Sequence, residues 1–397
     1  MRYWSTPHRH GCVTPTEHRD TEHWDSEHWD LVVVGAGPAG AAAALGALRA
    51  RPSLSVLMLD RAVFPRDKVC GDGVAPHVFD LLDDVGVTGL VADRVPVRRL
   101  RLRRGDHEVA RQMRRDAWVV PRAVFDFRLV DAACQAGAVL RQHRVRKVAE
   151  ATADVRVDGL RARVVVGADG VHSITRDAAR LPRPRMALAI RGYAPPVPDR
   201  RAEQVITFGT GPRPSYAWSF DRGDGLANVG YGEFLASGRS HTRSVLMQRL
   251  EALLPGSTAG GTSWRAHHLP LSSWAWPHPA GRVLLAGDAA GLVNPVTGEG
   301  IYYAVATGLL AGQAAAAAVF GGSPPGATYR RATRSLLARH LRHTAAAATL
   351  IRSGRVLDAG IRAAAADQRV FDDLVEMGLG QGLITPAIMK GLASGVR

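Results

Sequence analysis

The stretch Val283-Leu-Leu-Ala-Gly287-Asp288-Ala-Ala-Gly-Leu-Val-Asn-Pro295-Val-Thr-Gly298-Glu-Gly300 decides the fold of this chain. It predicts an apolar strand, a Gly-Asp turn, and a glycine-containing loop that leads into a long Ala-rich helix. A helix N-terminus reached through glycines attracts phosphates or anionic ring systems, because its free N–H groups and its dipole point at the ligand. Asp288 can accept hydrogen bonds from a polyol at the same place.

A dinucleotide-binding pattern stands near the start of the chain. The unbroken apolar run 31–34 predicts a buried parallel strand over 30–34, and a helix and a second strand over 54–59 follow. Asp60 ends that second strand, where an acidic side chain can hold ribose hydroxyls. Strand, glycines, helix, strand and acid in this order predict a Rossmann-like unit. Its turn residues are Gly35, Gly37, Ala39 and Gly40.

A third motif, Gly167-Ala-Asp169-Gly170, follows another apolar strand in the middle of the chain. The first pattern alone does not distinguish FAD from NAD, but the later Gly287-Asp288 motif favours FAD. Together the three motifs resemble the FAD-binding signature of the para-hydroxybenzoate-hydroxylase-like flavoproteins.

Further stretches resemble the geranylgeranyl reductase family of FAD-dependent oxidoreductases, from about Asp30 to the C-terminus. The loop Phe64-Pro-Arg-Asp-Lys-Val-Cys70-Gly71-Asp-Gly73 is similar to that family's Cys-Gly loop. The segment 214–220 is similar to its Tyr-x-Trp-x-Phe-Pro segment, and 294–300 and 370–382 also match. One departure is Asp221, where the family usually has Pro.

The resemblance implies the site residues. A polyprenyl substrate would contact Tyr216, Trp218, Phe220 and Gly71, and members of this family typically reduce carbon–carbon double bonds of polyprenyl chains. Such chains include the geranylgeranyl groups of lipids or pigments and the side chain of menaquinone. FAD would be held by Gly35, Gly37, Ala39, Gly40, Asp60, Arg61, Arg122, Asp169, Gly287, Asp288, Pro295, Gly298 and Gly300.

Reduction of an isolated alkene needs a hydride from flavin N5, an apolar tunnel and one positioned weak acid. Cys70 is the candidate catalytic residue, because it lies in a glycine-rich loop two residues from Lys68. The alternative is that Cys70 only fills space. The alternating Tyr216, Trp218 and Phe220 share one face of a strand, which is either a core face or a substrate wall.

The pattern of elements predicts an α/β fold in which two sheet domains are interleaved. Residues 30–94, 121–184 and 276–325 form the FAD-binding domain around a parallel sheet. Residues 95–120 and 185–275 form a substrate domain around an antiparallel sheet, because short alternating strands and turns dominate there. Residues 326–397 are helical up to about Met377, and 1–29 are expected to be a disordered extension. The His-containing repeat in that extension favours solvation over a metal site, so no metal is expected.

The formal charge of +15 comes almost entirely from arginine, since Lys68, Lys147 and Lys390 are the only lysines. No nucleic-acid motif accompanies this charge, so we expect no nucleic-acid partner. Attraction to a membrane surface is more plausible. Cys12, Cys70 and Cys134 form no disulfide framework, and no signal peptide is visible. We expect a cytoplasmic protein with peripheral membrane association.

Three functions compete. The first is an FAD-dependent reductase of isoprenoid double bonds, and the second is a flavin monooxygenase or halogenase of an aromatic natural product. The third is a flavoprotein that binds FAD or lipid without turnover. Glycines at 209–211 and 378–382 lack the strand–turn–helix context of a second dinucleotide site. The electron donor, NAD(P)H or a protein, is therefore expected to bind transiently.

Overall fold

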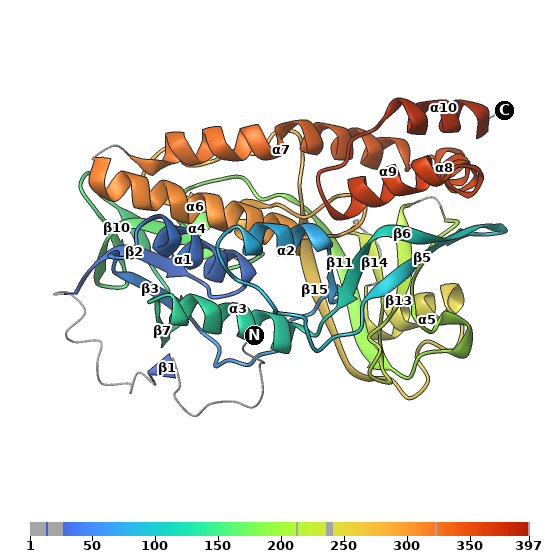
Figure 1. Cartoon of the computed structure of the whole chain (residues 1–397), viewed down its shortest axis with the longest axis horizontal. Helices are drawn as coiled ribbons and strands as arrows, with labels where there is room; N and C mark the ends of the chain where they lie inside the picture. Colours follow the sequence, from blue (N-terminus) through green and yellow to red (C-terminus); the bar gives the residue numbers. More distant parts are fainter. Residues whose placement is uncertain (1–12, 15–26, 212, 236–240, 322–323, 396–397) are drawn as a thin grey trace.

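The computed structural model describes residues 13–14, 27–211, 213–235, 241–321 and 324–395. Two sheets lie end to end, and long helices cover one side of both (Figure 1). The fold is mixed α/β, with a parallel sheet, an antiparallel sheet and C-terminal helices, as the sequence predicts. The repeat histidines His18 and His23 lie outside the described residues, whereas His28 begins a strand.

The first sheet is built on neighbouring parallel strands, in the order β1-β7-β3-β2-β10 with β16 also paired to β10. Antiparallel β9 and β8 extend it beyond β10. The second halves of the central strands β2 and β10 are apolar and fully buried, because both faces of the sheet are covered there. The strands are β1 (Val13–Thr14), β2 (His28–Val34), β3 (Val56–Asp60), β7 (Val139–Gln142), β8 (Val148–Glu150), β9 (Val155–Val157), β10 (Leu160–Gly167) and β16 (Val283–Leu285).

Two small-residue helices, α1 (Pro38–Ala50) and α6 (Ile301–Gly321), pack closely over this sheet. A Cβ at Gly312 would lie 2.0 Å from the Ala43 carbonyl oxygen, so the two backbones nearly touch. Helix α6 is long and apolar enough to cross a membrane by length and composition, but it is mostly buried inside the protein. The remaining helices of this part are α2 (Pro76–Asp83), α3 (Arg122–Gln135), α4 (Ile174–Ala178) and the 3₁₀ turn η3 (Gly287–Ala290).

The second sheet is largely antiparallel, in the order β15-β11-β14-β13-β12-β5-β6-β4. The hairpin of β5 and β6 joins it through a parallel pairing of β5 with β12. Helix α5 (Arg243–Leu253) packs on its outer face. The strands are β4 (Gly73–Val74), β5 (Val97–Arg104), β6 (His107–Val119), β11 (Arg185–Ala194), β12 (Glu203–Phe208), β13 (Ser215–Asp221), β14 (Ala227–Phe234) and β15 (Thr262–Leu271), and η2 (Pro198–Arg200) precedes β12.

Four helices complete the chain. The long α7 (Pro325–Leu350) lies beside α6, and α8 (Gly354–Ala366), α9 (Gln368–Leu379) and α10 (Pro386–Gly395) cover the β5–β6 hairpin (Figure 1). The helical region therefore extends past the expected limit at Met377, because a further helix, α10, begins at Pro386. Pro386 suits the first turn of a helix, where its missing N–H is not needed.

The cysteines differ from the expectation of three unpaired thiols. Cys134, near the end of α3, is disulfide-bonded. Cys70 is a free thiol in the loop before β4. The expectation is therefore wrong for Cys134 and holds for Cys70.

Candidate active site

A cavity of about 820 Å³ runs between the two sheets and under the C-terminal helices. Residues far apart in the sequence meet in it, since its walls come from the N-terminal glycine turn, the Cys70 loop, β13, β15, the 293–300 loop and α8–α10. The sequence-predicted residues that line it are Gly35, Gly37, Ala39, Asp60, Arg61, Cys70, Gly71, Arg122, Asp169, Tyr216, Trp218, Phe220, Asp288, Gly298 and Gly300.

The glycine turn before α1 leaves a helix N-terminus open to the cavity. Gly35 has a φ of +95°, and its N–H donates to the Leu59 carbonyl oxygen at 2.7 Å. A Cβ at Gly40 would lie 1.8 Å from the Gly35 carbonyl oxygen, so only glycine permits this approach. No side chain caps α1, and its first N–H groups are therefore available to an anion.

Asp60 anchors the other side of this turn. Its Oδ2 accepts the Ala36 N–H at 2.8 Å, and its Oδ1 accepts the Ala62 N–H at 2.9 Å. The side chain is buried at the edge of the cavity. Each carboxylate oxygen has a second lone pair, so Asp60 can still accept a hydroxyl donor from a ribose.

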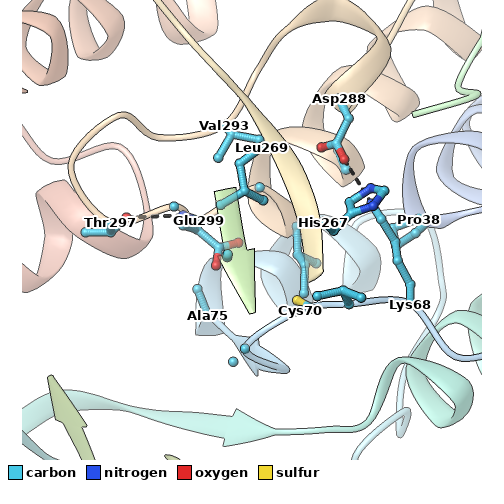
Figure 2. Close-up of a pocket in the computed structure, with 18 of the residues that line it drawn as sticks. Pro38, Lys68, Cys70, Ala75, His267, Leu269, Asp288, Val293, Thr297 and Glu299 are labelled. Carbon is cyan, nitrogen blue, oxygen red and sulfur yellow. Dashed lines mark hydrogen bonds and ion pairs between the residues drawn. The ribbon is translucent and has the colours of Figure 1, made fainter. Parts of the chain in front are cut away.

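The Gly-Asp turn after β16 places a carboxylate at the centre of the cavity. Gly287 has a φ of +57°, and its N–H donates to Thr307 Oγ1 at 3.0 Å. The Asp288 carboxylate lies 2.9 Å from the Lys68 ammonium (Figure 2). Burial alone would raise the pKa of Asp288, but Lys68, together with Arg122 and His267, lowers it below its usual value.

His267, on β15, lies next to this ion pair (Figure 2). Burial, followed by the Lys68 charge, lowers its pKa to about 4, so the imidazole is neutral at pH 7. The sequence reasoning did not assign a role to Lys68 or His267. The scarcity of lysine in an arginine-rich chain was the available signal for Lys68.

Cys70 faces the cavity beside a buried cation. The Arg122 guanidinium acts electrostatically on the Cys70 side chain and donates to Asp126 Oδ1 at 2.6 Å and Oδ2 at 2.9 Å. Burial raises the pKa of the Cys70 thiol despite Arg122. Burial alone would lower the pKa of Arg122, but the Asp126 carboxylate beside it favours the charged form, and the pKa is raised. The arrangement presents a protonated thiol to the cavity.

Strand β13 forms a wall against the Cys70 loop. Trp218 Nε1 donates to Asn228 Oδ1 at 2.8 Å, and Asn228 Nδ2 donates to the Cys70 carbonyl oxygen at 2.8 Å. A Cβ at Gly71 would lie 3.3 Å from the Phe220 ring. Tyr216 completes the wall, and its hydroxyl donates to the Thr297 carbonyl oxygen at 2.5 Å. The three aromatic residues thus connect the Cys70 loop to the 294–300 loop.

Asp221, the departure from the family pattern, is outside the lining of the cavity and closes a turn. Its Oδ2 accepts the Ala202 N–H at 2.6 Å, and its Oδ1 accepts the Gly223 N–H at 2.9 Å. The carboxylate satisfies two backbone donors that a proline would leave unpaired. The change from Pro to Asp therefore affects the turn after β13, and the aromatic wall is intact.

Glu299 is a buried carboxyl that the sequence reasoning did not single out, although it stands between Gly298 and Gly300. Its side chain faces the cavity (Figure 2). Burial raises its pKa to about 7, even though backbone N–H groups of Tyr302 and Ile301 favour the ionised form. Its burial depends on distant parts of the chain, which no local pattern reveals.

Three predicted cofactor residues lie outside the lining of this cavity. Gly40 supports the α1 turn, Gly287 packs against Ala39 and Ala304, and Pro295 lines two neighbouring cavities. Asp169 lines the main cavity, and burial raises its pKa. Its carboxylate also accepts from Ser173 Oγ at 2.5 Å and from the Thr175 N–H at 3.1 Å, which holds the start of α4.

The far half of the cavity is apolar. It lies between the second sheet and the C-terminal helices, and the sequence reasoning did not predict that these helices form its roof. No group of three or more His, Cys, Asp or Glu side chains suited to a metal ion occurs in the described parts of the chain. The apolar lining includes Leu100, Leu102, Ile206, Phe208, Ile361, Leu374, Ile384, Ile388 and Leu392.

The near half of the cavity fits FAD. An uncapped helix N-terminus suits the pyrophosphate, Asp60 suits the adenosine ribose, and Asp288 suits the ribityl hydroxyls. The 298–300 loop passes close to Asp288, since a Cβ at Gly300 would lie 3.5 Å from Asp288 Oδ1. When bound there, FAD supplies hydride chemistry to whatever occupies the apolar half.

Comparisons with known proteins agree with this assignment. A model described as an FAD binding domain matches residues 28–193. The chain is 32% identical over 321 residues to a protein named menaquinone reductase from Mycolicibacterium smegmatis, covering 71% of this chain and 75% of that protein. It is 32% identical over 315 residues to digeranylgeranylglycerophospholipid reductase 1 from Methanopyrus kandleri, covering 73% and 80%.

A solved structure has the same fold. The geranylgeranyl bacteriochlorophyll reductase-like protein from Thermoplasma acidophilum superposes with a TM-score of 0.75 at 23% identity, covering 93% of this chain and 96% of that one. The three FAD motifs, the Cys70 loop and these relatives lead to one conclusion. The chain belongs to the geranylgeranyl reductase family of FAD-dependent oxidoreductases.

Proposed function

We propose that this chain reduces carbon–carbon double bonds of a polyprenyl chain, with reduced FAD as the hydride source. The observation that carries the proposal is one cavity with two chemically distinct halves. Polar groups suited to FAD line one half. Aliphatic side chains from the second sheet and from the C-terminal helices line the other half. An extended hydrocarbon gains about 25 cal/mol for each Å² of apolar surface that such a lining removes from water.

The predicted site residues take the following roles in this proposal. The turn at Gly35 to Gly40, together with Asp60 and Arg61, holds the ADP part of FAD. Asp169, Gly287 and Asp288 position the ribityl region, and Pro295, Gly298 and Gly300 shape the loop beside the ring. Arg122 keeps Cys70 in place, and Cys70 contacts the reacting part of the substrate. The substrate wall consists of Gly71, Tyr216, Trp218 and Phe220.

An FAD-dependent monooxygenase or halogenase of an aromatic compound remains the second candidate, because such enzymes share the general flavin signature. The long aliphatic half of the cavity favours the reductase. Oxygen separates the two functions, since a reductase turns over without it and a monooxygenase stops. The test is anaerobic incubation of the chemically reduced FAD-bound protein with geranylgeranylated glycerophospholipid and with menaquinone. Mass spectrometry should find products with two additional hydrogens for each reduced bond.

The electron donor is proposed to bind transiently, either as NAD(P)H or as a protein carrier. The glycine cluster at 378–382 ends α9 and joins it to α10, so it does not open a helix after a strand. The cluster at 209–211 follows β12 and precedes β13. Neither has the geometry of a second dinucleotide site. Stopped-flow reduction of bound FAD by NADPH or by reduced ferredoxin would identify the donor.

Peripheral membrane association is proposed through one surface. A cavity of about 970 Å³ opens beside the second half of α7, and its rim carries Arg185, Arg213, Arg342 and Arg352 together with Trp274, which is 73% exposed. Arg213 and Arg352 also line a smaller cavity that shares Tyr216 and Leu357 with the main one. Cationic side chains beside an exposed Trp favour binding to an anionic phospholipid bilayer. A hydrophobic substrate would enter the protein from that bilayer.

A further inference from the structure

Glu299 is held in a defined position in the lining of the cavity. Its Oε1 accepts the Tyr302 N–H at 2.9 Å, and its own carbonyl oxygen accepts the Asn294 N–H at 2.7 Å. The 294–300 loop is also tied to the end of α9, because Thr297 Oγ1 donates to the Gly378 carbonyl oxygen at 2.9 Å. The Glu299 carboxyl and the Cys70 thiol face the same space (Figure 2).

The surroundings of Glu299 have opposing effects on its pKa. Burial is the largest, and it raises the pKa to about 7. Hydrogen bonds from the N–H groups at the start of α6 and the charge of Arg122 favour the carboxylate, while Asp288 disfavours it. The carboxyl can therefore hold a proton and release it near neutral pH, which is the property of an efficient general acid.

Other titratable groups that line this cavity are less suited to this task. Burial raises the pKa of the Cys70 thiol above 9.0 and the pKa of the Tyr216 phenol above 10.0, so both hold their protons too tightly at pH 7. The lowered pKa values of His267 and Asp288 leave these groups without a proton to give. The Asp169 carboxylate is already engaged with the start of α4.

We propose that Glu299 donates the proton that completes the reduction of the substrate double bond, an inference that rests on the proposed function. The O–H bond of the carboxyl breaks, and its proton forms a C–H bond with the π electron pair of the alkene. The neighbouring carbon, left electron-deficient, accepts the hydride for which reduced FAD is the source, and FAD ends oxidised. Water then reprotonates the Glu299 carboxylate.

Charged and titratable groups from several elements act on Glu299 or line the same cavity. They lie in the Cys70 loop, in α3, β13 and β15, in the turn after β16, and in α6. An electrostatic interaction joins Glu299 to Cys70, Arg122, Tyr216, Asp288 and Tyr303, its carboxylate accepts the Tyr302 N–H, and Lys68 and His267 line the same cavity.

The test compares the wild-type holoenzyme with Glu299→Gln. Glutamine keeps an oxygen for the Tyr302 N–H but has no acidic proton, so FAD content and substrate affinity should be unchanged while proton transfer is lost. Its kcat should fall by about 100-fold or more. The loss of wild-type activity as the pH rises through about 7 should disappear in the variant. Glu108→Gln, at an exposed ion pair with Arg101 on the β5–β6 hairpin, is the matched control and should match wild type.

A second readout needs no turnover. Infrared difference spectra of FAD-loaded protein, recorded during a pH titration, should contain a carboxyl C=O band that disappears near pH 7 in wild type and is missing from Glu299→Gln. Asp72→Asn and Asp169→Asn identify bands from two other buried carboxyls, since burial raises the pKa of Asp72 to about 6 and also raises the pKa of Asp169.

The outcomes separate this inference from the proposed function. If wild type reduces a polyprenyl substrate and Glu299→Gln keeps both its kcat and its pH profile, the inference is wrong and the function stands. The inference also fails if the wild-type carboxyl band is the same in the variant. If wild type reduces no polyprenyl substrate at any pH, the proposed function falls and the inference falls with it.

Discussion

The Lys68 ammonium lies 2.9 Å from Asp288 Oδ2, although the two residues are 220 positions apart in the chain. This ion pair connects the Cys70 loop to the turn that follows β16. Lys68→Met removes the cation and leaves the buried Asp288 carboxylate unpaired. We expect the free energy of unfolding to fall by about 1.5–3 kcal/mol, and FAD to bind at least several-fold more weakly.

Urea unfolding and fluorescence titration of the apoprotein with FAD measure these two effects. Lys147→Met is the control, because Lys147 is exposed and is one of the three lysines in the chain. Equal FAD affinity in wild type and Lys68→Met would show that the ion pair does not organise the cofactor site.

Gly360, on α8, faces the apolar half of the cavity, and a Cβ there would lie 3.8 Å from the Leu392 side chain. Gly360→Phe should place a ring inside the tunnel and shorten it. Turnover of a geranylgeranyl substrate should fall by about 10-fold or more, since overpacking costs about 1–3 kcal/mol, while a geranyl analogue should retain most of its rate.

The control for this variant is Ala365→Phe, five residues along α8 on its exposed face. Chain-length profiles measured with both variants test the direction of the tunnel. A uniform loss across chain lengths in Gly360→Phe would argue against a hydrocarbon beneath α8.

Local patterns predicted the parts of the fold that depend on neighbouring residues. The strand–glycine–helix units at Gly35 and Gly287 were visible because the turn, the close approach and the helix start follow one another in the sequence. The ion pair of Lys68 with Asp288 was not, since its partners lie 220 positions apart in the sequence. The roof formed by α8–α10 was also missed, because Ile361 and Ile388 look like ordinary helix-core residues until the tertiary fold places them over the cavity.

Because His278 is buried without a charge, the stability of the folded protein depends on pH. Burial, with contributions from Arg176, Arg330 and Arg334, lowers its pKa to about 3, and its ring packs edge-on against Tyr329 at 5.2 Å. In the unfolded chain the His278 imidazole has its ordinary pKa of 6.5, whereas in the folded protein it takes up a proton only at a much lower pH. This contribution to stability is therefore complete above pH 6.5 and is lost as the pH falls toward about 3.

His278→Phe removes this protonation penalty and keeps a ring against Tyr329. The acid-unfolding midpoint, followed by circular dichroism, should move to lower pH than in wild type. The exposed His28, at the start of β2, provides the control variant His28→Phe, which should leave the midpoint in place. An unchanged midpoint in His278→Phe would mean that this imidazole titrates freely in the folded protein.

The arginine rim beside α7 predicts charge-dependent binding to lipid. Arg342→Glu combined with Arg352→Glu should lower co-sedimentation with vesicles of phosphatidylglycerol by about 10-fold or more, at about 1 kcal/mol for each basic residue near the surface and with reversal of sign. Vesicles of phosphatidylcholine should bind little of either protein.

Arg49→Glu combined with Arg156→Glu changes the net charge equally at exposed positions on α1 and β9, away from that rim. This control should bind the anionic vesicles like wild type. Equal losses in the two double variants would assign the binding to net charge and not to this surface.

The most direct test of the central claim is a single turnover without oxygen. Holoenzyme reduced with one equivalent of dithionite is mixed anaerobically with a geranylgeranylated lipid, while flavin absorbance and product mass are followed together. We expect oxidised FAD to reappear in step with a product that carries two more hydrogens. Flavin that stays reduced until oxygen is admitted, and then yields an oxygenated or unchanged lipid, would contradict the account.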